Sequence, residues 1–306
     1  QQQFAGSLAL EVGYQGNHSS HQLLQPDFNA CPNFGTLNSN INCNSLRRTP
    51  FIGGISGTST FGFGNYDALT AKLEKRMSNG LQFITAYTYG HALSNTGTTL
   101  SGSQGFGYKD NTNISTSYAS AAWDIRHNFT TGFTYELPFG RGKQYGANLN
   151  KVVDLMLGGW QTNGIVTFHT GNPYTIRANG CQGVFASCYP DLVNGKNPDA
   201  APSGGRNPSH WFDTANFTAP ASLTEGNLGL QTNYGPATRT VDLSLFKDFA
   251  FTERWKLQFR AESFNIGNTS QFSVPDNNIS DAKFGQVTGT QTGSERHVQF
   301  SLRLQF

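Results

Sequence analysis

The chain has 306 residues, and its 21 basic and 19 acidic side chains leave a formal net charge of +2. Charged residues make up 13% of the chain, about half the ~25% usual for soluble domains, whereas glycine (35) and phenylalanine (24) are abundant. No basic cluster extends beyond Arg47 and Arg48, which argues against a nucleic-acid partner. A mean hydropathy of −0.43 and the lack of any apolar run of about 18 residues exclude a transmembrane helix. The composition favours an all-β protein.

Alternation of apolar and polar side chains with a period of two predicts eight β-strands. In chain order, we expect them at 8–15, 66–76, 81–93, 125–139, 160–170, 241–249, 255–265 and 296–306. Ser78-Asn79-Gly80 predicts a tight turn between the second and third strands, and 252–254 turns the sixth strand into the seventh. One helical turn is expected at 151–157.

The last strand shows the pattern most clearly. Its even-numbered residues from Val298 to Phe306 are all apolar, and its odd-numbered residues from His297 to Gln305 are all polar. The segment therefore has one apolar and one polar face. Repeated segments of about ten residues with this weak signal are typical of an outer-membrane β-barrel.

The lengths of the connections distinguish a barrel from other β folds. They run long, short, long, medium, long, short, long. In bacterial outer-membrane barrels, short periplasmic turns alternate with long extracellular loops, so this order predicts an antiparallel transmembrane β-barrel with its C-terminus in the periplasm. A secreted two-sheet sandwich explains the alternation equally well, but not the asymmetry of the loops. Aromatic residues near the strand ends fit the girdles of the two membrane interfaces: Tyr14, Tyr87, Tyr89, Tyr135, Phe139, Trp160 and Trp255.

Four cysteines form two close pairs, Cys31 with Cys43 and Cys181 with Cys188, in polar stretches expected to be extracellular loops. Local disulfides made in an oxidising compartment are the favoured interpretation. A cysteine-rich metal site is the alternative, but neither pair has the two-residue spacing of zinc ligands, and no histidine pair flanks them suitably.

Charged and strongly polar side chains on the strands are costly on a surface that faces lipid, so we expect them to face the lumen. The candidates are Lys72, Glu74, Lys256, Gln258, Arg260, Glu262 and Arg303. One interpretation is a salt-bridged barrel wall or a surface that docks a plug. The other is a substrate path, which needs partners outside this chain.

The sequence predicts no catalytic, cofactor or metal site. His18 and His21 lie near Asp27, but the segment is expected to be a loop with surface histidines. Residues 276–281 (DNNISD) superficially resemble a calcium loop but lack its glycine and its closing glutamate. No Gly-x-Ser-x-Gly segment is present to anchor a catalytic triad.

Ten short segments carry a family resemblance in their order along the chain. They are LEVGYQG at 10–16, NYDAL at 65–69, LEKR at 73–76, GLQ at 80–82, AYTY at 86–89, WDIRH at 123–127, LPFG at 137–140, GGWQ at 158–161, DLSLFK at 242–247 and FRAESFN at 259–265. Together with the terminal Phe306, they resemble the C-terminal part of the barrel of Oar-like TonB-dependent outer-membrane receptors, which carry a carboxypeptidase-regulatory-like domain.

The resemblance implies energy-coupled uptake through a plugged barrel of about 22 strands, with no enzymatic activity and no cofactor. Its implied partners are outer-membrane lipid, the assembly machinery that reads Phe306, an unknown extracellular ligand, and the TonB energy-coupling protein through missing N-terminal parts. By likeness alone, Asp124, Arg126 and His127 form a rim cluster. We expect 1–306 to be one barrel portion that contains neither the plug nor the N-terminal domains.

About eight strands cannot form the whole of such a barrel. An open sheet in lipid leaves two edges of unpaired backbone groups, each costing several kcal/mol. Either upstream strands complete the wall, or these eight close on themselves as an anchoring or adhesive barrel, which is geometrically possible. A third hypothesis, an outer-membrane hydrolase, needs a serine or aspartate paired with a histidine at the outer rim.

Overall fold

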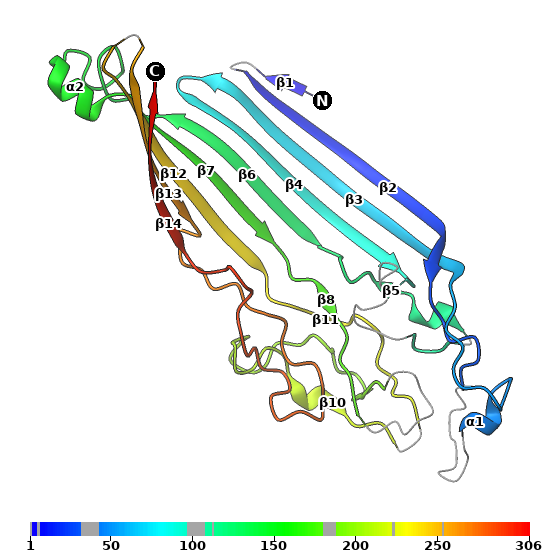
Figure 1. The fold of residues 1–306 in the computed structure, drawn as a ribbon. Coiled ribbons are helices and arrows are strands. Elements are labelled where there is room, and N and C mark those ends of the chain that lie inside the picture. The colour runs from blue at the N-terminus through cyan, green and yellow to red at the C-terminus, as the bar shows by residue number, and fades with distance from the viewer. Residues whose placement is uncertain are drawn as a thin grey trace.

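In the described part of the chain, eight long strands form one antiparallel sheet, in which they pair in chain order (Figure 1). The structure, a computed structural model, describes residues 2–4, 7–31, 43–96, 108–111, 113–179, 188–221, 224–252 and 254–306. The strands are β2 (Leu8–Leu24), β3 (Ser59–Ser78), β4 (Leu81–Ser94), β6 (His127–Glu136), β7 (Trp160–His169), β12 (Thr238–Ala250), β13 (Lys256–Phe264) and β14 (His297–Gln305). Short strands β1 (Gln2–Phe4) and β5 (Ala119–Ser120) pair with β2 and β4. Within the described ranges, no helix has the length and apolar character needed to cross a membrane.

All eight predicted strands are confirmed, but β2 and β3 are much longer than expected. β2 continues to Leu24 and β3 begins at Ser59, so the segment with His18 and His21 is strand and not loop. The prediction of a loop was wrong because this part of β2 lacks apolar alternation. Pairing with β3 keeps it extended, and His18 lies opposite Asn65.

The two ends of the sheet differ sharply (Figure 1). One end, which we call the turn rim, carries the β3–β4 turn, the β12–β13 turn and the connection 137–159 with helix α2 (Lys151–Leu157). Asn79 and Gly80 have φ values of +52° and +75°, the left-handed conformation that the favoured two-residue hairpin turn requires at both positions. The other end, the loop rim, carries the long connections, with α1 (Cys43–Leu46) in the first of them.

The register gives the sheet one apolar and one polar face. Directly paired residues of antiparallel strands point to the same side, so each strand's alternation is continued by its neighbours. Leu245 is opposite Ala261, which is opposite Phe300, whereas Phe246, Arg260 and Ser301 follow one another on the other side. The apolar face includes Leu10, Val12, Tyr14, Leu73, Phe83, Phe129, Phe133, Leu243, Leu245, Phe259, Phe300, Leu302 and Leu304.

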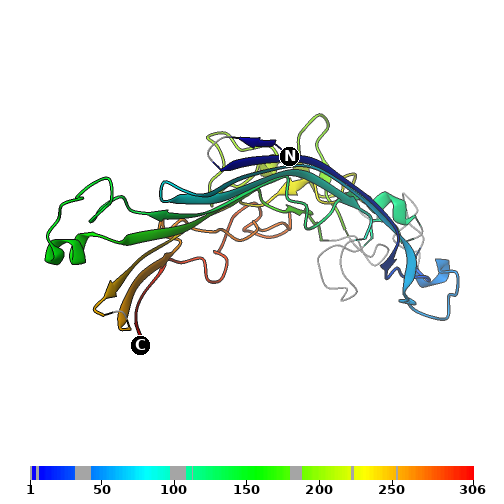
Figure 2. The same cartoon turned by 90° about the horizontal axis from the view of Figure 1, so that it is seen from above.

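Among the described residues, no second sheet covers the apolar face. Phe300 is 71% exposed and Leu302 is 68% exposed. In a two-sheet sandwich these residues would form the core, so the sandwich alternative does not fit this structure. The sheet is a curved, open strip, and no pairing joins β14 to β1 or β2 (Figure 2).

The buried hydrophobic cluster of the molecule lies outside the sheet. It is in the connections at the loop rim, where Tyr174, Ile176, Phe212, Phe217 and Leu228 pack together, with Phe284 against them. Two short ladders brace this region: β8 (Pro173–Tyr174) pairs with β11 (Asn233–Tyr234), and β9 (Asp191–Leu192) pairs with β10 (Phe217–Thr218). The elements of the described residues also include the 3-10 helices η1 (Ile114–Ser117) and η2 (Thr214–Asn216). The described part of the β7–β12 connection, residues 170–179, 188–221 and 224–237, is therefore a packed unit, which we call the loop-rim unit.

Candidate functional site

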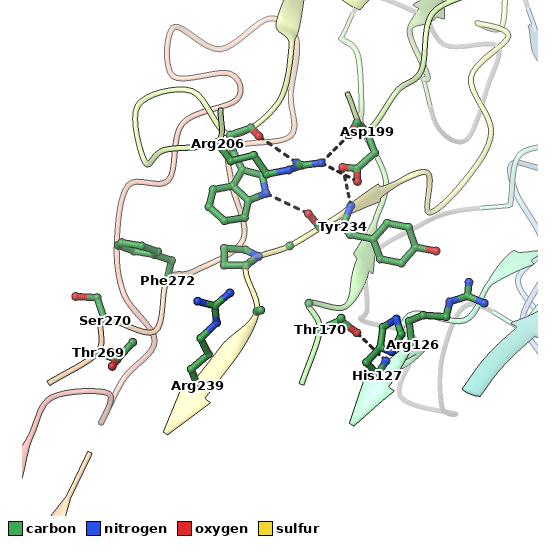
Figure 3. Close-up of a pocket in the computed structure, with 15 residues that line it drawn as sticks. Arg126, His127, Thr170, Asp199, Arg206, Tyr234, Arg239, Thr269, Ser270 and Phe272 are labelled. Carbon is green, nitrogen blue, oxygen red and sulfur yellow. Dashed lines mark hydrogen bonds and ion pairs between the residues drawn. The ribbon is translucent and has the colours of Figure 1, made fainter. Parts of the chain in front are cut away.

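A cavity of about 710 Å³ opens where the loop-rim unit meets the ends of β6, β7 and β12 (Figure 3). We call it the rim cavity. It is lined by Arg126, His127, Thr170, Gly171, Asp199, Arg206, Trp211, Tyr234, Gly235, Pro236, Ala237, Arg239, Thr269, Ser270 and Phe272. Its volume lies within the range of small-molecule sites, which combine apolar and aromatic walls with a few polar groups.

One wall of the rim cavity is built on Arg206. Its guanidinium donates to both the backbone carbonyl and the carboxylate of Asp199, at 2.6 and 2.9 Å, and to the carbonyl of Trp211 at 3.0 Å. The Trp211 indole N–H donates to the carbonyl of Tyr234 at 3.1 Å, and the backbone N–H of Tyr234 donates to Asp199 at 3.2 Å. Burial raises the pKa of Asp199, and the bonds from Tyr234 and Arg206 oppose that rise. This wall is fixed by its own hydrogen bonds.

The facing wall contains Arg239, at the start of β12. Its backbone N–H and C=O both bond to the amide of Gln271, at 3.0 and 2.7 Å, which ties the strand to the following loop. The guanidinium lies 5.6 Å from the centre of the Phe168 ring. Arg239 points into the space between Phe272 and His127, whereas the guanidinium of Arg126 turns away (Figure 3). Within the described ranges, no carboxylate pairs with Arg239, so this guanidinium can meet a ligand.

The third side of the rim cavity is the start of β6. The backbone N–H of His127 donates to the Thr170 hydroxyl at 3.1 Å, and the backbone N–H of Thr170 donates to the carbonyl of His127 at 3.0 Å. The His127 ring lies 2.8 Å from the Tyr87 hydroxyl. Next to it, Asp124 is 1% exposed; it accepts from the backbone N–H of Ala92 at 2.7 Å and lies 3.0 Å from the His91 ring and 3.7 Å from Arg126. The structure thus brings Asp124, Arg126 and His127 to the loop rim.

The chemistry of the rim cavity is that of binding. It offers the guanidinium of Arg239, which no described carboxylate pairs, together with hydroxyl groups and aromatic surfaces. This set suits a ligand with an anionic or carbonyl group on an apolar or ring-shaped body. Among the described residues, no group of three or more histidine, cysteine, aspartate or glutamate side chains is placed to hold a metal. In the same part of the chain, no serine hydroxyl bonds to His91.

The predicted lumen residues all lie on the polar face, but in two groups. The register places Lys72 and Glu74 on β3, and Lys256, Gln258, Arg260, Glu262 and Arg303 on β13 and β14. β4, β6, β7 and β12 lie between the groups. The side chains form short local pairs: Lys72 with Glu74 at 3.1 Å, Arg260 with Glu262 at 3.7 Å, Gln299 with Glu262 at 2.6 Å and Gln258 with Asp248 at 2.9 Å. These contacts fit a salt-bridged wall.

Two lysines that the sequence reading overlooked lie on the apolar face. Lys75 is opposite Phe83, and Lys247 is opposite Trp160 and Phe259. Each bends to the turn rim, where Lys75 donates to the carbonyls of Ser78 and Leu81 at 2.7 and 2.8 Å, and Lys247 donates to the carbonyl of Gly158. The alternation along each strand could have revealed them. Both lysines have odd numbers, as do the apolar residues that share their face of β3 and β12.

The remaining sequence predictions concern loops. Cys31 and Cys188 have no free thiol, but Cys181 and the side chain of Cys43 lie outside the described residues, so the pairing stays a prediction. Asp276 accepts from the backbone N–H of Asn278, whose amide donates to Asp281 at 3.2 Å. These carboxylates thus stabilise a turn.

The fold and its surfaces define a class of protein. An antiparallel sheet with an exposed apolar face, a polar opposite face and long loops on one rim is the wall of a transmembrane β-barrel. A family model described as an outer membrane beta barrel domain matches residues 1–299, and the chain belongs to this family. Its location is therefore the outer membrane.

Comparison with solved structures finds similarity to the outer membrane transporter YddB from Escherichia coli. The two share 9% sequence identity and a TM-score of 0.48, and the match covers 99% of this chain and 31% of that transporter. The chain thus spans less than a third of the transporter's length. Comparison with curated proteins finds no significant match.

Proposed function

We propose that this chain is part of the barrel wall of an outer-membrane receptor that takes up an extracellular ligand with the help of the TonB energy-coupling protein. The open edge of the sheet carries this proposal. Among the described residues, β14 ends the order of strands without a partner on its outer side, and unpaired backbone groups are costly in lipid. Further strands outside the described sheet satisfy these groups, and a wall larger than eight strands leaves room for a plug and a substrate path.

The surfaces of the sheet support the same proposal. The polar face, with the locally paired charges around Glu262 and Lys72, lines the lumen, and the apolar face meets lipid. The loop rim is extracellular and the C-terminus periplasmic, as the alternation of long and short connections predicts. The rim cavity lies at the loop-rim end of the apolar face, because Arg239 is opposite Phe168. No described carboxylate pairs with Arg239, and an extracellular ligand is first bound here, beyond the part of that face that meets lipid.

The self-closed barrel of eight strands has less support. It requires a ladder between β14 and β2 or β1, and the sheet has none. The Oar-like branch and the TonB partner rest on the resemblance of the ten short segments alone, and they are part of the proposal.

The proposal is tested with the native gene in its own cells. Wild-type cells should deplete the transported small molecules from the medium, as measured by mass spectrometry. Deletion of the coding region for residues 1–306 should abolish this depletion, and a separate deletion of the energy-coupling protein should abolish it for the same molecules. An Arg239→Ala variant should reduce this depletion, whereas Arg254→Ala at the turn rim should not. If depletion of every compound is unchanged in both deletion strains, the uptake proposal is wrong.

A further inference from the structure

Helix α2 exposes an apolar stripe at the turn rim. Val152 is 69% exposed and Met156 is 60% exposed, and Leu155 beside them is also exposed. Residues three and four apart share one side of a helix, so these three form a single stripe. On the other sides of α2, Val153 and Asp154 are half-buried, and Asp154 accepts from the backbone N–H of Arg141 at 2.7 Å. No described residue covers this stripe, and Leu157, on another side of the helix, is also 56% exposed.

The position of α2 joins this stripe to the apolar face of the sheet. Lys247 and Trp160 are opposite one another on that face. Lys247 donates to the carbonyl of Gly158, and the Trp160 indole N–H donates to the carbonyl of Met156 at 2.9 Å. Both side chains therefore hold the C-terminal end of α2 on the apolar side of the sheet. In Figure 1, α2 lies at the turn-rim end of the sheet, just before β7.

The connection 137–159 has the charge of a segment that lies on a membrane. It contains Arg141, Lys143 and Lys151 against the single acidic residue Asp154. A short helix with an apolar stripe and basic neighbours lies in the plane of the interface, with its apolar side among the acyl chains and its basic residues at the phosphates. The lipid-facing surface of an outer-membrane barrel continues directly into this stripe.

We propose that α2 is an interfacial anchor that inserts Val152, Leu155 and Met156 into the phospholipid leaflet at the turn rim. This proposal rests on the apolar face being the lipid-facing one. α2 is too short to be stable alone. At its start, the Asn150 side chain accepts from the backbone N–H of Val153, and at its end Lys247 donates to the carbonyl of Gly158. These contacts with the rest of the protein stabilise the helix, and its exposed apolar side chains are then buried in lipid.

The test uses the native full-length protein in isolated outer membranes, with a nitroxide spin label on a single added cysteine. Val152→Cys and Met156→Cys are compared with Gln144→Cys, an exposed polar position of the same connection, and with Phe300→Cys on the apolar face. Labels at 152 and 156 should collide severalfold more with oxygen than with a water-soluble nickel chelate, as the label at 300 should, and the label at 144 should show the reverse.

The outcomes test the α2 anchor separately from the assumption that the apolar face of the sheet meets lipid. If labels at 152 and 156 behave like the one at 144 while the label at 300 reports lipid, the anchor is wrong and the barrel orientation stands. If 152 and 156 are shielded from both reagents, a protein covers the helix, and the lipid anchor is again overturned. If the label at 300 reports water, the lipid-facing surface itself has been misassigned, and the anchor falls with it.

Discussion

The ammonium group of Lys247 hydrogen-bonds to the backbone carbonyl of Gly158, so a cation on the apolar face of β12 binds the last turn of α2. The lysine is 3% exposed, and its ammonium lies 5.1 Å from the centre of the Phe249 ring and 5.8 Å from that of Trp160. Cations are favoured at the C-terminal end of a helix, where the carbonyls lack partners. The charge is thereby compatible with a surface that is otherwise apolar.

Replacing this lysine tests that contact. Lys247→Met keeps the length of the side chain but leaves the carbonyl of Gly158 without its donor, so we expect a loss of about 1–3 kcal/mol in the free energy of unfolding. Protease cleavage within 137–159 should become faster at the same time. Lys196→Met, an exposed lysine of the β7–β12 connection, serves as the control. Unchanged cleavage in Lys247→Met would show that α2 is held by other contacts.

Adjacent residues of β14 test which face meets lipid. Phe300→Arg places a charge on the apolar face, and near the middle of the bilayer this should cost about 2–4 kcal/mol. Gln299→Arg places the same charge on the polar face, opposite Glu262, and should change stability little. Urea unfolding in lipid vesicles measures both. Equal effects of the two variants would contradict the assignment of the faces.

Phe306 is expected to be an assembly signal. Its ring stacks on Trp255 with centres 5.5 Å apart, and the side chain is otherwise exposed. We expect Phe306→Ala, or deletion of Phe306, to impair insertion into the outer membrane, whereas Phe306→Tyr retains it. Heat-modifiable migration in gels and surface labelling on intact cells are the measurements. Normal migration and display of the deletion variant would refute the prediction.

The cysteine pairs can be tested by chemistry. Non-reducing peptide mass spectrometry of protein isolated from cells should show Cys31 linked to Cys43 and Cys181 linked to Cys188, because an oxidising compartment favours local loop disulfides. Alkylation before reduction should leave all four cysteines unmodified. Free thiols in both pairs would overturn the argument that these loops are outside the cytoplasm.

The loop-rim unit should respond to pH through Glu225. Burial raises the pKa of Glu225 from its ordinary value to about 7, against the opposing effect of Lys109. Because the folded-state pKa is raised, this group stabilises the unit fully below about pH 4.5, and the contribution is lost as pH rises through about 7. Hydrogen exchange at 224–231, corrected for the intrinsic rate, should accelerate between about pH 5 and about pH 8. Glu225→Gln should abolish that change, and an identical pH response in the variant would exclude Glu225 as its source.

Local pattern was sufficient for the sheet. The alternation from Val298 to Phe306, the Asn79-Gly80 turn and the unequal connections placed eight strands and both rims, because side chains on a strand alternate with a period of two whatever surrounds them. The same pattern put the charged residues around Arg260 on one face. It did not extend β2 through His18 and His21, because that segment is held by pairing with β3 and has no apolar alternation of its own.

What only the tertiary structure decided depends on contacts distant in sequence. The rim cavity joins Asp199 and Arg206 to Arg239 and His127. The buried cluster joins Tyr174 and Phe212 of the β7–β12 connection to Phe284 of the β13–β14 connection, and no periodicity relates these residues. The same holds for Lys247. Its charge lies on the apolar face, and only the folded chain shows that its ammonium group donates to the carbonyl of Gly158. The sequence alone determined strands and their faces because these follow from backbone geometry. Sites built from side chains of separate loops follow from packing, which only the folded chain defines.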